Sequence, residues 1–199
     1  MNNRTLGIIA MAGAPFLLID TITGGFNPYS HSSMTGLFGL IYMAGWMCSL
    51  VALKRSGAYG EGKWAKIIYT LQLCLLVLAN AWNTYELIRP GAGTTLYYIL
   101  DACWPLSNTC MLITGITIAR KGVLQGWKRY MPLLVGLWLP IGFLLWALFG
   151  SRTTAMLLWV NIYSAVTWAL MGYSVFTSRV RKNSKPYTTK KEQLAVTGL

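Results

Sequence analysis

Residues 97–115, YYILDACWPLSNTCMLITG, have the length and apolar content of a membrane-crossing helix, yet they carry groups that lipid disfavours. About 20 mostly apolar residues cross a hydrocarbon core of about 30 Å. The stretch nevertheless contains the carboxylate of Asp101, the helix-disrupting Pro105 and the amide of Asn108. Polar groups at such depth normally face the protein interior or water. The stretch therefore predicts a spanning helix with one functional face.

The rest of the chain has the same apolar character. Of its 199 residues, 55% are hydrophobic and only 11% are charged, which argues against a soluble domain. Short connections make consecutive helices antiparallel neighbours. We therefore expect an all-α integral membrane protein, with six transmembrane helices in one compact antiparallel bundle over residues 1–178. The predicted spans are 5–24, 33–53, 65–88, 95–118, 131–149 and 154–176.

The distribution of lysine and arginine predicts the orientation of this bundle. Basic residues gather at the N-terminus, in alternate connections and in the tail, whereas only Arg89 and Arg152 fall on the other side. By the positive-inside rule, both termini are expected in the cytoplasm, beneath a plasma (inner) membrane that we take to be bacterial. The net charge of +12 fits this topology and contact with anionic lipid. No nucleic-acid partner is expected, and residues 179–199 are predicted to form a flexible basic tail.

Polar side chains from four predicted helices lie at a similar depth. Three of the five acidic residues lie in or at the edge of spans, all toward the predicted outer side, and no lysine or arginine lies in a span interior. At about 1.5 Å per residue, Asp20, Asp101 and Asn161 lie roughly 6–11 Å from the outer helix ends. Asn80 and Asn83 bracket the same level. This layer predicts one shared site.

The spacing of these residues places them on helix faces that also carry tryptophan. Residues at i, i+3, i+4 and i+7 share a face. A layer of carboxylates, amides and indoles without a basic residue favours a cation or a proton-exchanging group. The predicted ligand-binding residues are Asp20, Asn80, Asn83, Asp101, Trp104, Asn108, Asn161, Ser164 and Trp168. The chain also has more tryptophans than the membrane edges require, so some must face other helices or a ligand.

Prolines interrupt three of the predicted spans. Pro105 cannot donate a hydrogen bond to the carbonyl of Asp101, four residues earlier, and so leaves two oxygen acceptors together. Interrupted helices at this depth commonly mark substrate or ion sites. Pro15 and Pro140 are expected to bend the first and fifth spans in the same way.

A purely structural interpretation of the polar layer competes with the functional one. Asp20 and Asp101 could be protonated, or hydrogen-bonded to the asparagines, and so join helices together. The pattern does not decide between these readings. Glu86 is expected to pair with Arg89, three residues later, at the membrane interface. His31 is expected to be a surface residue.

The composition narrows the function without identifying it. A single histidine argues against haem and multi-histidine metal sites, so we expect neither cofactor nor metal. The leading hypothesis is transport or sensing of a small cationic or amphipathic molecule, in contact with membrane lipids and in a homo-oligomer or larger assembly. One alternative is a non-catalytic subunit of a membrane complex that contacts helices, pigments or lipids. Another is a carboxylate-based lipid enzyme, although catalysis is not the favoured reading.

Overall fold

The computed structural model describes residues 1–27, 31–150 and 153–178, and the described part of the chain contains helices and connections but no strand. The predicted tail, residues 179–199, lies outside the described residues. The helices are α1 (Asn3–Gly13), α2 (Phe16–Thr23), α3 (Ser33–Arg55), α4 (Lys63–Ile88), α5 (Thr95–Lys121), the 3-10 helix η1 (Gly126–Tyr130), α6 (Met131–Gly136), α7 (Trp138–Phe149) and α8 (Thr154–Phe176).

The lengths of these helices confirm the predicted helical bundle. Five spans are long and apolar enough to cross a membrane, and a sixth is counted if the bent pair of η1–α6 and α7 is taken as one span. The first span is made of α1 and α2 together. These features indicate a membrane protein.

Hydroxyl and amide side chains fix where four of the helices begin. Each accepts a hydrogen bond from the backbone N–H three residues later, which satisfies a donor that the first helical turn leaves free. These N-caps are Asn2, Ser32, Thr94 and Thr153. At the other end of α5, Gly122 adopts a left-handed conformation with φ of 62°, which ends the helix.

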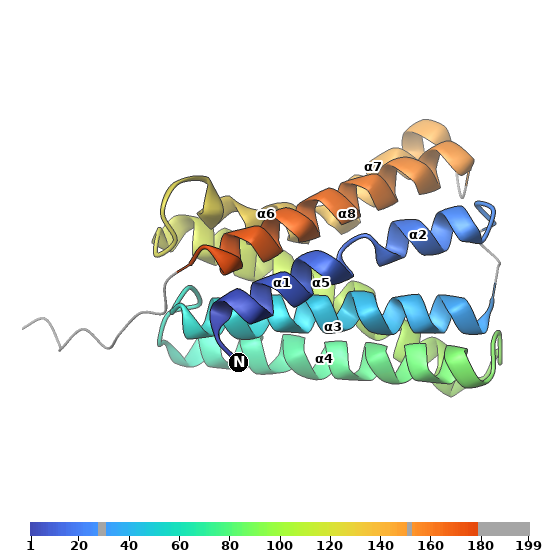
Figure 1. The fold of residues 1–199 in the computed structure, drawn as a ribbon, viewed down its shortest axis with the longest axis horizontal. Coiled ribbons are helices and arrows are strands. Elements are labelled where there is room, and N and C mark those ends of the chain that lie inside the picture. The colour runs from blue at the N-terminus through green and yellow to red at the C-terminus, as the bar shows by residue number, and fades with distance from the viewer. Residues whose placement is uncertain (28–30, 151–152, 179–199) are drawn as a thin grey trace, which may run out of the picture.

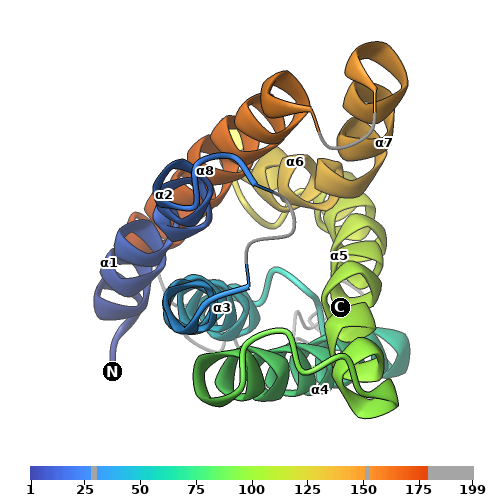
Figure 2. The same ribbon diagram turned by 90° about the vertical axis from the view of Figure 1, so that its right-hand side faces the viewer.

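The spans follow one another around a ring in the order of the sequence (Figure 2). α1 packs on α3, α3 on α4, α4 on α5, α5 on α6, and α8 closes the ring against α1. α3 also contacts α8, although the two helices are not consecutive in the ring. Because consecutive spans are neighbours and run in opposite directions (Figure 1), the bundle has an up-and-down topology.

The two ends of the bundle differ in charge. We call one end, where α3 and α5 finish and α4 begins, the basic end, and the opposite one the acidic end. The N-terminus and the end of α8 both lie at the basic end (Figure 1). The Arg55 guanidinium donates to the backbone oxygen of Met1 there, at 2.6 Å. The basic end carries Lys54, Arg55, Lys63, Lys66, Arg120, Lys121, Lys128 and Arg129.

Buried side chains fill the bundle near the basic end. Trp46 and Leu50 of α3 are fully buried, together with Met111 and Met171 from facing helices. The connection between α3 and α4 folds onto this core, where the Tyr59 hydroxyl donates to Gln72 Oε1 at 3.2 Å. Burial raises the pKa of Tyr59, so its hydroxyl stays a donor across the physiological range. Side chains of the helices and of the α3–α4 connection are therefore packed together near this end.

Two of the prolines lie at breaks in their spans. Pro15 separates α1 from α2. The fifth span bends by 55° between η1–α6 and α7. Pro140, in the first turn of α7, cannot donate to the carbonyl of Gly136, and the break falls between these two residues. Pro105, by contrast, lies inside α5, which continues from Thr95 to Lys121.

Candidate functional site

The spans enclose a main cavity of ≈ 540 Å³ toward the acidic end. Side chains from α2, α3, α4, α5, α7 and α8 all line it, so every span of the ring contributes to its wall. A volume of this size falls within the range of about 300–1,000 Å³ that is typical of small-molecule sites. Its polar lining residues are Asp20, Thr35, Tyr42, Asn83, Asp101 and Asn161.

The carboxylates of two separate helices face this one cavity. Asp20 lies on α2 and Asp101 on α5, and both line the wall. Among the described residues that line the main cavity, none is lysine, arginine or histidine. The wall therefore offers acidic oxygens to a bound molecule without an internal basic partner.

Aromatic rings make up much of the remaining wall. Trp104 of α5 packs on Trp138 of α7 with ring centroids 4.8 Å apart. Trp82 of α4 lines the cavity and packs against Tyr97, at 5.4 Å. The indole N–H groups of Trp82, Trp104 and Trp138 are buried and have no hydrogen-bond partner among the described residues. The wall thus combines two carboxylates with several indole rings.

A second cavity of ≈ 490 Å³ adjoins the first at the acidic end and is more polar. The two cavities share five lining residues: Asp20, Thr35, Trp82, Asp101 and Leu157. Beyond this shared level, the second cavity is lined by His31, Tyr97 and glycines of the connections. Both carboxylates consequently lie at the boundary between an apolar cavity and a polar one.

Five of the nine predicted ligand-binding residues line the main cavity: Asp20, Asn83, Asp101, Trp104 and Asn161. The two asparagines are partly held by their neighbours. Asn161 Nδ2 donates to Thr21 Oγ1 at 2.6 Å, which joins α8 to α2. Asn83 Nδ2 donates to Asn80 Oδ1 at 3.4 Å within α4.

The other four predicted residues lie outside the cavity wall and join helices behind it. Asn80 Nδ2 donates to Met47 Sδ at 3.3 Å. Asn108 Nδ2 donates to the Val135 carbonyl at 3.3 Å. α4 and α5 are rotated so that the amides of Asn80 and Asn108 meet a neighbouring helix. Other residues on the same predicted faces line the cavity.

Ser164 and Trp168 have a similar supporting position on α8. The Ser164 hydroxyl is 3.0 Å from the Tyr42 hydroxyl, and both residues are buried. Trp168 packs edge-on against Trp46 with ring centroids 5.2 Å apart. Tyr42 itself lines the main cavity. The contact with Ser164 therefore holds Tyr42, a residue of the cavity wall, from the side that faces away from the cavity.

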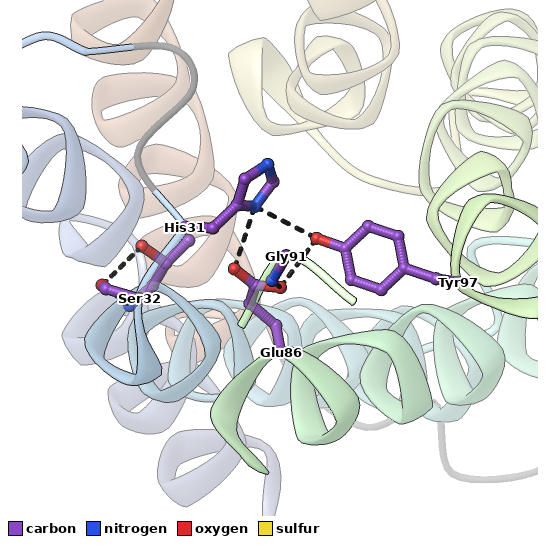
Figure 3. A network of polar contacts seen from close by, with 6 residues as sticks. His31, Ser32, Glu86, Gly91 and Tyr97 are labelled. Atoms are coloured by element: carbon purple, nitrogen blue, oxygen red, sulfur yellow. Dashed lines mark hydrogen bonds and ion pairs between the residues drawn. The ribbon is translucent and has the colours of Figure 1, made fainter. Parts of the chain in front are cut away.

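A buried carboxylate, Glu86, organises the acidic end (Figure 3). Its side chain is 0% exposed and collects three polar contacts. His31 Nδ1 lies 3.0 Å from Oε1, and Oε2 accepts from the Tyr97 hydroxyl at 2.7 Å and from the Gly91 N–H at 3.0 Å. Three donors around one carboxylate satisfy a group that would otherwise be costly to bury.

This cluster replaces the ion pair with Arg89 expected for Glu86 from the sequence, whereas His31 is exposed as expected, with a side chain 45% accessible, and also contacts Glu86. The expected partner, Arg89, is exposed at the end of α4, while Glu86 points inward to His31. Gly91 allows the approach, because it adopts a φ of 65° and a Cβ there would lie 3.3 Å from the Cβ of His31. The cluster thus joins the start of α3, the end of α4 and the start of α5 beside the second cavity.

Sequence reasoning did not assign several wall residues. Thr35, Trp82, Trp138, Phe143 and Trp146 all line the main cavity. The excess of tryptophans over the needs of the membrane edges was the available signal, but it could not say which indoles face inward. No family model, curated protein or solved structure matches this chain.

Proposed function

We propose that this chain is a membrane protein that binds a small cationic or amphipathic molecule in the main cavity and transports or senses it. The observation that carries the proposal is that Asp20 and Asp101, from different helices, line one cavity with no basic residue among its described lining residues. Removing two carboxylates from water is costly, and a bound cation offsets that cost. Indole faces add attraction for cations.

The charge of the two ends supports an orientation for this site. Basic side chains concentrate at the end where the N-terminus and the end of α8 lie. The positive-inside rule then assigns that end to the cytoplasm of a bacterial cell and the acidic end to the outside of its plasma membrane. In this orientation the second cavity leads from the external solution to the carboxylates.

The test is a binding measurement on the full chain in a neutral maltoside detergent. Tetramethylammonium and longer alkyltrimethylammonium ions serve as probes, and quenching of tryptophan fluorescence reports binding, because Trp82 and Trp104 line the cavity. Asp101→Asn and Asp20→Asn each remove a charge with little change in volume. We expect each to weaken binding at least tenfold, or about 1.4 kcal/mol.

Glu61→Gln is the matched control, since it removes one carboxylate from an exposed position in the connection between α3 and α4. We expect this variant to bind like the wild type. The proposal is wrong if Asp101→Asn and Asp20→Asn fold normally and bind all probes with wild-type affinity. Probe uptake into sealed vesicles then separates transport from sensing.

A further inference from the structure

We propose that the ligand is a cationic amphiphile with one alkyl tail, and that the tail leaves the main cavity sideways between α5 and α7. This inference rests on the proposed function, because Asp20 and Asp101 must hold the cationic head. It adds the chemical class of the ligand and the route by which it reaches the site.

The layering of the two cavities suits a molecule with a charged head and an apolar tail. Asp20 and Asp101 belong to both cavities, so a cation between them lies at their boundary. Apart from the residues that it shares with the second cavity, the main cavity is lined largely by apolar side chains, among them Leu100, Trp138 and Phe143. A ligand occupying this space must bury apolar surface beyond its charge, which favours an alkyl chain.

The cavity suits an organic cation better than a metal ion. Calcium takes six to eight oxygen ligands, and magnesium requires near-octahedral oxygen coordination. Among the described residues, no group of three histidine, cysteine, aspartate or glutamate side chains could hold a metal. Indole faces, in contrast, are well suited to quaternary ammonium groups. The lining therefore favours an alkylammonium head.

Between the bend in the fifth span and the acidic end, α7 diverges from α5. Below the bend α6 packs closely on α5, because Gly115 meets the backbone of Leu133 and Gly136 meets that of Leu112. Above it the 55° bend directs α7 outward. Figure 2 shows the start of α5 beside α4, with α7 well apart from it.

Two residues of α7 belong both to the cavity wall and to the exposed surface. None of the 12 residues of α7 is buried. Phe143 and Trp146 line the main cavity, yet they are 57% and 49% exposed. In a bilayer, the outer surface of α7 faces lipid. An alkyl chain passing these rings would stay in apolar surroundings from the carboxylates to the hydrocarbon.

The structure provides a matched pair of positions for testing this route. Phe143 and Leu144 are adjacent on α7 and are both 57% exposed, but only Phe143 lines the cavity. Tetramethylammonium tests the head alone, and dodecyltrimethylammonium tests the head with a tail. Both are measured on the full chain in maltoside detergent. The ratio of variant to wild-type affinity cancels the partitioning of each probe into micelles.

We expect Phe143→Ala to weaken dodecyltrimethylammonium binding about fivefold, because part of the contact with the tail is lost. Tetramethylammonium binding should change less than about twofold in Phe143→Ala, and Leu144→Ala should leave both probes unaffected. If Phe143→Ala folds poorly, Trp146→Ala replaces it, with Leu148→Ala as its control. Leu148 is 67% exposed and does not line the cavity.

Two results distinguish failure of this inference from failure of the proposed function. If Asp101→Asn weakens both probes but Phe143→Ala and Leu144→Ala affect the long probe equally, the lateral route is overturned and the cation site stands. The same conclusion follows if Phe143→Ala weakens the two probes equally. If Asp101→Asn weakens neither probe, the proposed function fails, and this inference fails with it.

Discussion

The Tyr97 hydroxyl allows the Glu86 cluster to be tested by removing a single oxygen atom. Tyr97→Phe deletes the donor that lies 2.7 Å from Glu86 Oε2 and leaves the ring in place against Trp82. Glu86 then keeps His31 Nδ1 and the Gly91 N–H as partners. A hydrogen bond to a charged group is worth about 1.5–3 kcal/mol, so we expect the free energy of unfolding to fall by that amount.

Thermal unfolding in neutral detergent measures this loss. For a chain of this size, each kcal/mol corresponds to about 2–4 °C in the melting temperature, so Tyr97→Phe should lower it by roughly 3–12 °C. Tyr98→Phe makes the same chemical change one residue away, at a side chain that is 62% exposed. That control should change stability by less than about 0.5 kcal/mol. Equal melting temperatures for the two variants would refute the assigned role of the cluster.

Two further predictions concern the contacts that hold the cavity wall. Gly136→Ala puts a methyl group against the backbone of Leu112 and should lower the free energy of unfolding by about 1–3 kcal/mol. Gly62→Ala is the control and should be close to neutral, because no atom lies within 4 Å of the added Cβ. Comparable losses in both variants would contradict the close α5–α6 packing. The hydroxyl groups of Tyr42 and Ser164 lie 3.0 Å apart. In a double-mutant cycle of Tyr42→Phe and Ser164→Ala, we expect a coupling of about 0.5–1.5 kcal/mol in the free energy of unfolding. If the losses of the two single variants simply add, this hydrogen bond does not stabilise the bundle.

The sequence by itself determined the helical spans and the depth of the acidic residues. A span is recognised by its apolar length, which is a local property, and the helices begin and end close to the predicted positions. Depth follows from counting residues along a helix. For this reason Asp20 and Asp101, far apart in the chain, could be expected at one level, and both line the main cavity.

Only the tertiary structure decided how each helix is rotated and which side chains meet. Asn108 and Trp104 share a predicted face, yet Trp104 lines the cavity while Asn108 bonds to the Val135 carbonyl. His31 and Glu86 are 55 residues apart, so no local pattern could pair them. The rotation of each helix and the contacts of its side chains depend on packing between several helices at once. The apolar length of a span and the depth of a residue depend on the sequence of one helix alone.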